Sequence, residues 1–153
     1  MKLSELLTEN NIIPDLKARD KKGALEELAE VIVSHEPALD KSALVRVLLE
    51  RERLGSTGIG DGVAIPHGKF HGIKQPVISF GRSRRGLDFD SMDGEPAYLF
   101  FLLVAPENSA SMHLKALAKI ARILKNSSFR KELMEVPTRN EIYRTIIQND
   151  EDF

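Results

Sequence analysis

His67 ends a glycine-rich stretch, which makes it the first candidate for chemistry in this chain. The stretch covers residues 55–68 and reads GSTGIGDGVAIPHG. A glycine-rich segment loses much conformational entropy on folding, so we expect one where the backbone turns tightly or approaches another group closely. Imidazole is the one side chain whose unperturbed pKa lies near neutrality. We therefore interpret His67 as the reactive group and the preceding loop as its support.

Two residues outside the stretch could assist His67. Arg51 lies on the apolar face of a helix expected over residues 40–55. It either lays its stem on the core and extends its charge to solvent, or directs a cation towards an anion held by the next loop. His113 falls in the first turn of a helix expected over residues 109–125, where free backbone N–H groups favour anions. It is either an inward-facing polar residue or a hydrogen-bond donor to an oxyanion beside His67.

These residue types fit phosphoryl chemistry. A neutral imidazole is a competent nucleophile towards phosphorus, and the phosphoramidate that forms carries nearly two negative charges. An arginine, a helix start and a second histidine are the environment that such an adduct needs.

Other catalytic classes lack their signatures. His67 and His71 are four residues apart but follow a proline in an expected loop, and no HExxH pattern occurs, so we expect no metal site. The glycine stretch lacks the lysine of a phosphate-binding loop and lies between a helix and a strand, which argues against nucleotide binding. No G-x-S-x-G sequence supports a serine nucleophile. We expect no cofactor.

Composition narrows the class of protein further. The 153 residues include 22 Lys and Arg against 23 Asp and Glu, and no cysteine. A net charge of −1 gives no global attraction for nucleic acid or anionic membrane. The basic cluster at residues 82–86 is interpreted as a solvated, charged turn rather than a nucleic-acid site. No membrane span or signal peptide is recognisable, so we expect a cytoplasmic protein.

The order of the expected elements predicts an α/β (α+β) domain, with a mixed sheet between helical layers, as one domain over residues 1–153. Strands are expected at residues 63–65, 77–81 and 98–105; the last is apolar throughout, which is typical of a strand buried on both faces. Helices are expected at residues 20–34, 40–55, 109–125 and 128–135, with a last helix opened by the capping box of Thr138 and Glu141. The buried face of the helix at 109–125 is expected to contain Leu114, Leu117, Ala118, Ala121 and Leu124.

The sequence resembles a known family along essentially its whole length. It is similar to the enzyme IIA domains of the bacterial phosphoenolpyruvate-dependent phosphotransferase system, of the mannitol/fructose type and most closely the stand-alone nitrogen-regulatory branch. The resemblance rests on residues 50–54 (ERERL), 55–69 (GSTGIGDGVAIPHGK), 86–89 (GLDF) with 92–94 (MDG), and 112–114 (MHL). The family's fold is a mixed sheet between helical layers.

The resemblance also implies roles for the three candidate residues. His67 matches the residue that accepts the phosphoryl group, on the ring nitrogen remote from the backbone (tele-phosphohistidine), while Arg51 and His113 match the family's active-site arginine and second histidine. The implied donor is a histidine-phosphorylated carrier protein (HPr-like). The phosphoryl group then either controls binding to regulatory target proteins or passes to a IIB domain for fructose- or mannitol-type sugar uptake. A binding module that never carries phosphate is the remaining alternative.

Overall fold

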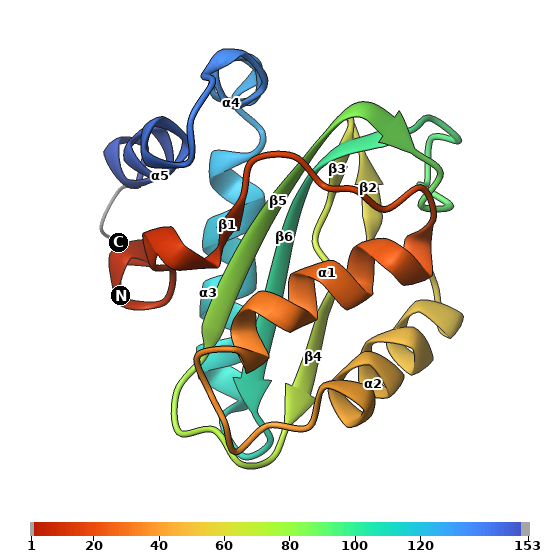
Figure 1. The fold of residues 1–153 in the computed structure, drawn as a ribbon, viewed down its shortest axis with the longest axis vertical. Helices are drawn as coiled ribbons and strands as arrows, with labels where there is room; N and C mark the ends of the chain where they lie inside the picture. The colour runs from red at the N-terminus through yellow and green to blue at the C-terminus, as the bar shows by residue number, and fades with distance from the viewer. Residues whose placement is uncertain (1, 151–153) are drawn as a thin grey trace.

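A mixed sheet lies between two helical layers in the computed structural model, which describes residues 2–150 (Figure 1). The strands are β1 (Ile12–Ile13), β2 (Gly58–Gly60), β3 (Val63–Ala64), β4 (His67–Phe70), β5 (Val77–Leu87) and β6 (Ala97–Pro106). The α-helices are α1 (Lys21–Val33), α2 (Lys41–Arg53), α3 (Ala110–Ile123), α4 (Ser127–Glu135) and α5 (Arg139–Gln148). Two short 3-10 helices, η1 (Leu3–Glu5) and η2 (Glu9–Asn11), precede β1. The expected three-layer α/β class is confirmed.

The sheet is organised around β6, the most buried strand. Its order is β1-β5-β6-β3-β2, and β4 also pairs with β6. β5 runs antiparallel to β6, whereas β3 and β4 both run parallel to it. The sheet is therefore mixed, as the sequence predicts.

Side chains of β6 alternate between two cores, which explains its uninterrupted apolar sequence. One core lies between the sheet and α3, α4 and α5, and includes Leu99, Phe101 and Leu103. The other lies between the sheet and α1 and α2, and includes Phe100 and Leu102. In Figure 1, α1 and α2 cross the front of the sheet and α3 lies behind it.

The helices begin where local sequence predicts. The carboxylate of Asp20 accepts a hydrogen bond from the Gly23 N–H at 2.8 Å, and Asp40 caps α2 in a similar way. The Thr138 hydroxyl accepts from the Glu141 N–H at 3.1 Å and donates to the Glu141 carboxylate. Local side-chain chemistry therefore sets these boundaries.

The charged turn expected at residues 82–86 is wrong, because β5 continues through it to Leu87. Arg82 pairs with Leu99 of β6 and is fully buried, and its guanidinium donates to three backbone carbonyl groups. Arg84 and Arg85 are exposed, as expected. One arginine of this charged cluster is therefore buried, and its hydrogen-bond acceptors lie on segments distant in the sequence.

The buried face expected for α3 is also partly wrong. Leu114 is 65% exposed and Ala118 is exposed as well. The face that packs inward consists of His113, Ala116, Lys119, Ile120 and Ile123. The charge of Lys119 makes this face hard to recognise from the sequence. Lys119 is tolerated there because it pairs with Asp150 inside the fold, at 2.8 Å between Nζ and Oδ1.

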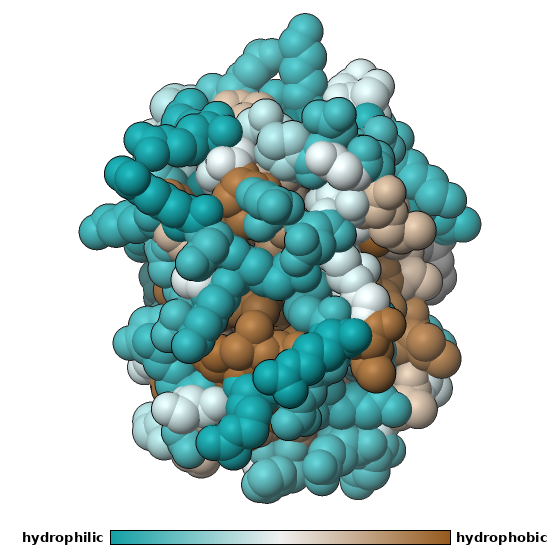
Figure 2. Space-filling view, turned by 90° about the vertical axis from the view of Figure 1, so that its right-hand side faces the viewer, coloured by the Kyte–Doolittle hydropathy of each residue, from teal (hydrophilic) through white to brown (hydrophobic). Residues whose placement is uncertain are grey.

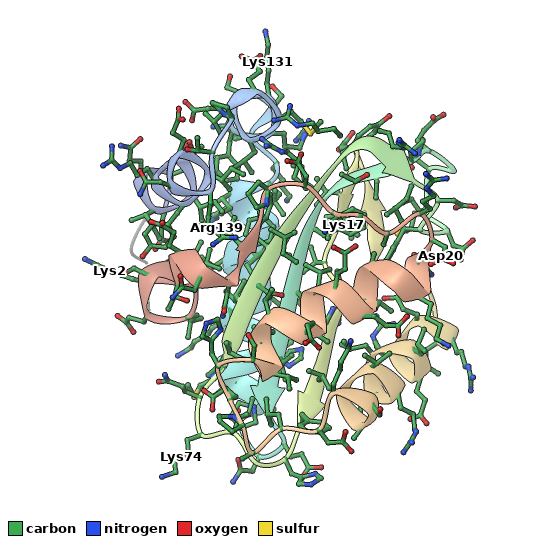
Figure 3. All side chains as sticks on the ribbon, viewed as in Figure 1. Lys2, Lys17, Asp20, Lys74, Lys131 and Arg139 are labelled. Carbon is green, nitrogen blue, oxygen red and sulfur yellow. The ribbon has the colours of Figure 1, made fainter. Side chains whose placement is uncertain are left out.

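Many other charged side chains lie on the outside of the molecule. Figure 3 shows the labelled Lys2, Lys74 and Lys131 pointing away from the fold. Across residues 2–150, every helix falls short of the length and apolar character needed to cross a membrane.

Candidate functional site

His67 opens β4 at an interrupted edge of the sheet. Val63 and Ala64 pair with Leu99 and Phe100 of β6, and His67 resumes the pairing opposite Leu103. Between the two short strands lie Ile65 and Pro66; proline has no N–H to donate to a ladder. Residues 67–70, which were expected to form a loop, are therefore a strand. The interruption before this strand leaves the Ile65 carbonyl available to accept a hydrogen bond from the His67 ring.

The Ile65 carbonyl contacts the His67 ring directly. It lies 2.7 Å from Nδ1 of His67, and a carbonyl oxygen can only accept a hydrogen bond. We therefore assign the proton of the neutral ring to Nδ1 and the free electron pair to Nε2. Nε2 is the ring nitrogen remote from the backbone.

Electrostatics favour this neutral form. Burial lowers the pKa of His67 and outweighs the bond to Ile65, which acts in the raising direction. The positive charge of Arg51 lowers the pKa further. A neutral imidazole is the form that can act as a nucleophile.

His113 faces His67 from the first turn of α3. The two ring centroids lie 5.4 Å apart at an interplanar angle of 70°, an edge-on arrangement. His113 is buried, and within residues 2–150 its Nδ1 has no hydrogen-bond partner. Burial, followed by the charges of His67 and Lys69, lowers the pKa of His113. The two histidine rings therefore contact each other at the site.

Strand alternation explains why these histidines meet. Gly68 faces α2: a Cβ atom there would lie 3.1 Å from Cγ1 of Val47. Successive side chains of a strand point to opposite faces, so His67 points towards α3. The two histidines are 46 positions apart in the sequence, and β5 and β6 lie between them along the chain.

Arg51 approaches the site from the other helical layer. It lies in the last turn of α2, and its Nη1 donates to the Gly55 carbonyl at 2.8 Å. Its positive charge acts on His67 in the same direction as burial and lowers the pKa of that ring. The structure thus brings His67 and His113 into ring contact and leaves Arg51 bound to the glycine-rich segment, within electrostatic range.

Two glycines in the segment before His67 have clear steric roles. A Cβ atom on Gly58 would lie only 3.0 Å from the Cα of Ser91. Gly62 has φ +77°, in the left-handed region that favours glycine. The segment therefore packs closely against the loop that contains Ser91 and turns sharply at Gly62. It also contains the short strand β2, which the sequence interpretation missed.

Sequence reasoning also missed Glu52, a buried carboxylate next to Arg51. Its side chain accepts hydrogen bonds from the Thr57 N–H at 3.1 Å and from the Thr57 hydroxyl. The signal was present: Leu44, Leu48 and Glu52 recur every four residues, which places Glu52 on the apolar stripe of α2.

His71 does not join His67. Its ring stacks on Phe70, with centroids 5.2 Å apart. Four steps along an extended backbone cover about 13 Å, which is too far for the two histidines to share a metal ion. No group of three potential metal-ligating side chains was found among residues 2–150.

Exposed hydrophobic side chains occur on the segments that build the site. The large ones in residues 2–150 are Leu54, Ile59, Met92, Met112 and Leu114. Leu54 follows the helix that bears Arg51, and Met112 and Leu114 flank His113. Figure 2 looks from the right-hand side of Figure 1, where β4 and α2 lie, and shows hydrophobic groups exposed within a mainly hydrophilic face.

The fold and site together define an α/β domain with a histidine pair at an interrupted sheet edge. Residues 5–149 match the family described as phosphoenolpyruvate-dependent sugar phosphotransferase system, EIIA 2. The chain therefore belongs to this family, whose role is phosphotransfer.

Similar proteins include both branches of the family. A nitrogen regulatory protein of Bradyrhizobium diazoefficiens is 42% identical over 146 residues, covering 95% of each chain. A fructose-specific EIIABC component of Bacillus subtilis is 38% identical over 150 residues; the match covers 98% of this chain but only 24% of that protein. The crystal structure of nitrogen regulatory protein IIA-Ntr from Neisseria meningitidis superposes with a TM-score of 0.88 at 37% identity, covering 94% of this chain and 98% of that one.

Proposed function

We propose that this protein is a phosphoryl relay that accepts a phosphoryl group on Nε2 of His67 from a histidine-phosphorylated carrier protein. The observation that carries the proposal is the 2.7 Å contact between His67 Nδ1 and the Ile65 carbonyl. It holds the ring proton on one nitrogen and leaves the other as the nucleophile.

The proposed transfer exchanges one P–N bond for another. Nε2 attacks phosphorus in line, the bond to the donor histidine breaks, and the donor ring leaves with its electron pair. The Nδ1 proton stays on His67, bonded to the Ile65 carbonyl, and offsets part of the charge of the new adduct. Positioning and charge stabilisation supply most of the catalysis in a loose phosphoryl-transfer transition state.

Arg51 and His113 would stabilise the equatorial phosphoryl oxygens. Arg51 would exchange its bond to the Gly55 carbonyl for a charge-assisted bond to oxygen. His113 would donate a hydrogen bond from its ring, which lies against that of His67. The relay needs no metal or cofactor, because the donor is itself a phosphohistidine.

The exposed hydrophobic side chains beside the site support docking of a protein donor. Leu54 and Leu114 are 86% and 65% exposed. An apolar surface next to a reactive group is typical of a protein interaction site.

Labelling tests the proposal directly. Incubation with phosphoenolpyruvate, the first enzyme of the system and the carrier protein should phosphorylate wild-type protein, and His67→Ala should remain unlabelled. His71→Ala is the matched control and should label like wild type. If His67→Ala accepted phosphate as well as wild type does, the proposed acceptor would be wrong; absence of labelling in wild type would favour a pure binding module.

We further propose that the relay serves nitrogen regulation, in which the phosphorylation state of His67 controls binding to target proteins. Identity to the nitrogen regulatory protein along nearly the whole of both chains supports this role. Transfer to a IIB domain for sugar uptake is the alternative, supported by the likeness to a fructose-specific EIIABC component. Phosphorylated protein mixed with fructose-type and mannitol-type IIB domains distinguishes them, since rapid loss of the label to either would favour transport.

A further inference from the structure

Glu52 is a buried negative charge beside a site that handles phosphate, which calls for a physical explanation. Its side chain is 4% exposed. It lies in the last turn of α2, where the helix dipole disfavours a carboxylate. A carboxylate there would also repel an incoming phosphoryl group. Both of these effects are unfavourable, so the value of Glu52 must come from the ion pair and the hydrogen bonds that it makes.

Those bonds begin a chain that ends on His67. The Glu52 carboxylate accepts from both the backbone N–H and the hydroxyl of Thr57. The Thr57 carbonyl accepts from the Ile65 N–H at 3.0 Å. The Ile65 carbonyl in turn accepts from His67 Nδ1 at 2.7 Å. Two backbone residues thus connect the carboxylate to the reactive ring.

Lys21 compensates the buried charge. Its Nζ lies 3.0 Å from Glu52 Oε1 and 3.2 Å from Asp90 Oδ2, and it sits 4.7 Å from the ring centre of Phe89. A buried carboxylate is tolerated only when it is paired and hydrogen-bonded. The first turn of α1, the last turn of α2 and the loop after β5 are therefore joined at the Lys21 ammonium group.

We propose that Glu52 is a positioning residue for His67, acting through Thr57 and Ile65 to fix the carbonyl that holds the Nδ1 proton. The inference deepens the phosphoryl-relay function proposed above and rests on it. Without Glu52, the segment between α2 and β3 loses its anchor, and the Ile65 carbonyl no longer holds one tautomer of His67. Nε2 is then the attacking nitrogen for a smaller fraction of the time, and it is less well aligned.

Three variants separate this role from alternatives. Glu52→Gln removes the charge at nearly constant size, and Thr57→Val removes the hydroxyl but keeps the N–H and the Lys21–Glu52 pair. Glu50→Gln, an exposed position on the same helix, is the matched control for charge. Nitrogen-15 NMR of the unphosphorylated proteins reports the His67 tautomer without any donor, and melting curves report folding.

The rate of phosphoryl acceptance from the carrier is then measured over a range of carrier concentrations up to saturation, which gives both the maximal rate and the KM. We expect Glu52→Gln to lower this rate about tenfold to a hundredfold, with the KM for the carrier unchanged and a reduced fraction of the Nδ1–H tautomer. Thr57→Val should show the same changes to a smaller extent, and Glu50→Gln should behave as wild type.

Three results would overturn the proposal. An unchanged rate or tautomer in folded Glu52→Gln protein would make the network structural only. A faster rate in that variant would show that charge repulsion outweighs positioning. If Glu52→Gln fails to fold, wild-type values in Thr57→Val overturn it. Failure of wild type to be phosphorylated would reject the relay function instead, while the tautomer measurement would still test the connection from Glu52 to His67.

Discussion

Burial of the His67 and His113 rings lowers the pKa of both below the ordinary value of about 6.5. Each ring is therefore neutral in the folded protein at pH values where an unfolded chain begins to bind protons. For His67 this state suits a nucleophile, since only the unprotonated Nε2 carries an electron pair. For His113 it avoids a buried positive charge beside the His67 ring.

Acid should destabilise the protein through these two residues. Below pH 6.5 these two histidines bind protons in the unfolded chain but not in the folded protein. The free energy of unfolding therefore decreases as pH falls from 6.5 towards the lowered pKa values. Urea denaturation at pH 7.5 and 5.5 should show a larger acid loss in wild type than in the double variant His67→Gln/His113→Gln. Equal losses in the two proteins would contradict this assignment.

At the scale of elements, the site depends on close packing between β4 and α2. A Cβ atom at Gly68 would lie 3.1 Å from Cγ1 of Val47 and 3.5 Å from Cδ2 of Leu48. The glycine lets the helix that bears Arg51 approach the strand that bears His67. In the sequence Pro66-His67-Gly68, the proline lies where the strand is interrupted, the histidine is the candidate reactive group, and the glycine leaves room for α2.

Enlarging residue 68 should force the helix away from the strand. We expect Gly68→Val to lower the free energy of unfolding by about 1–3 kcal/mol, the usual cost of overpacking. Val47→Ala in the same chain should recover part of this loss, because it removes the atom that the new side chain meets. Urea denaturation of the two single variants and the double variant gives the coupling energy; strictly additive effects would refute a direct contact.

At the scale of the whole molecule, Arg82 ties separate segments to the sheet. Its Nε donates to the Pro14 carbonyl at 3.0 Å, and its Nη1 donates to the carbonyls of Leu133 and Val136 at 2.8 and 2.5 Å. One residue thus holds the connection between β1 and α1 as well as the end of α4. This fully buried side chain secures the end of α4 against the sheet.

Removing this guanidinium should be costly. Arg82→Met leaves buried carbonyl groups without donors, and we expect a loss of about 3 kcal/mol or more in the free energy of unfolding. Arg82→Lys should recover only part of it, because a single ammonium lacks the planar fork. Arg85→Met, at an exposed position of the same strand, should stay within about 0.5 kcal/mol. A neutral effect of Arg82→Met in chemical denaturation would argue against this role.

Local chemistry made much of the fold predictable from sequence. Helix caps such as Asp20 and Thr138 bond to residues only three positions away. The apolar sequence of β6 indicates burial on both faces even when the neighbouring strands and helices are unknown. Side chains satisfied by distant groups were harder to predict: the charge of Arg82 suggested exposure, and Lys119 was absent from the expected buried face, yet the partners of both lie on other segments.

The sequence by itself determined the family, the glycine-rich segment and His67 as the reactive candidate, because the motif is contiguous. Tertiary structure decided which nitrogen of His67 is free, because this depends on a carbonyl released by the break between β3 and β4. It also decided that His113 lies against His67 and that Glu52 is anchored to Thr57. These relations arise from strand register and from packing between layers, and neither is encoded in the spacing of residues along the chain.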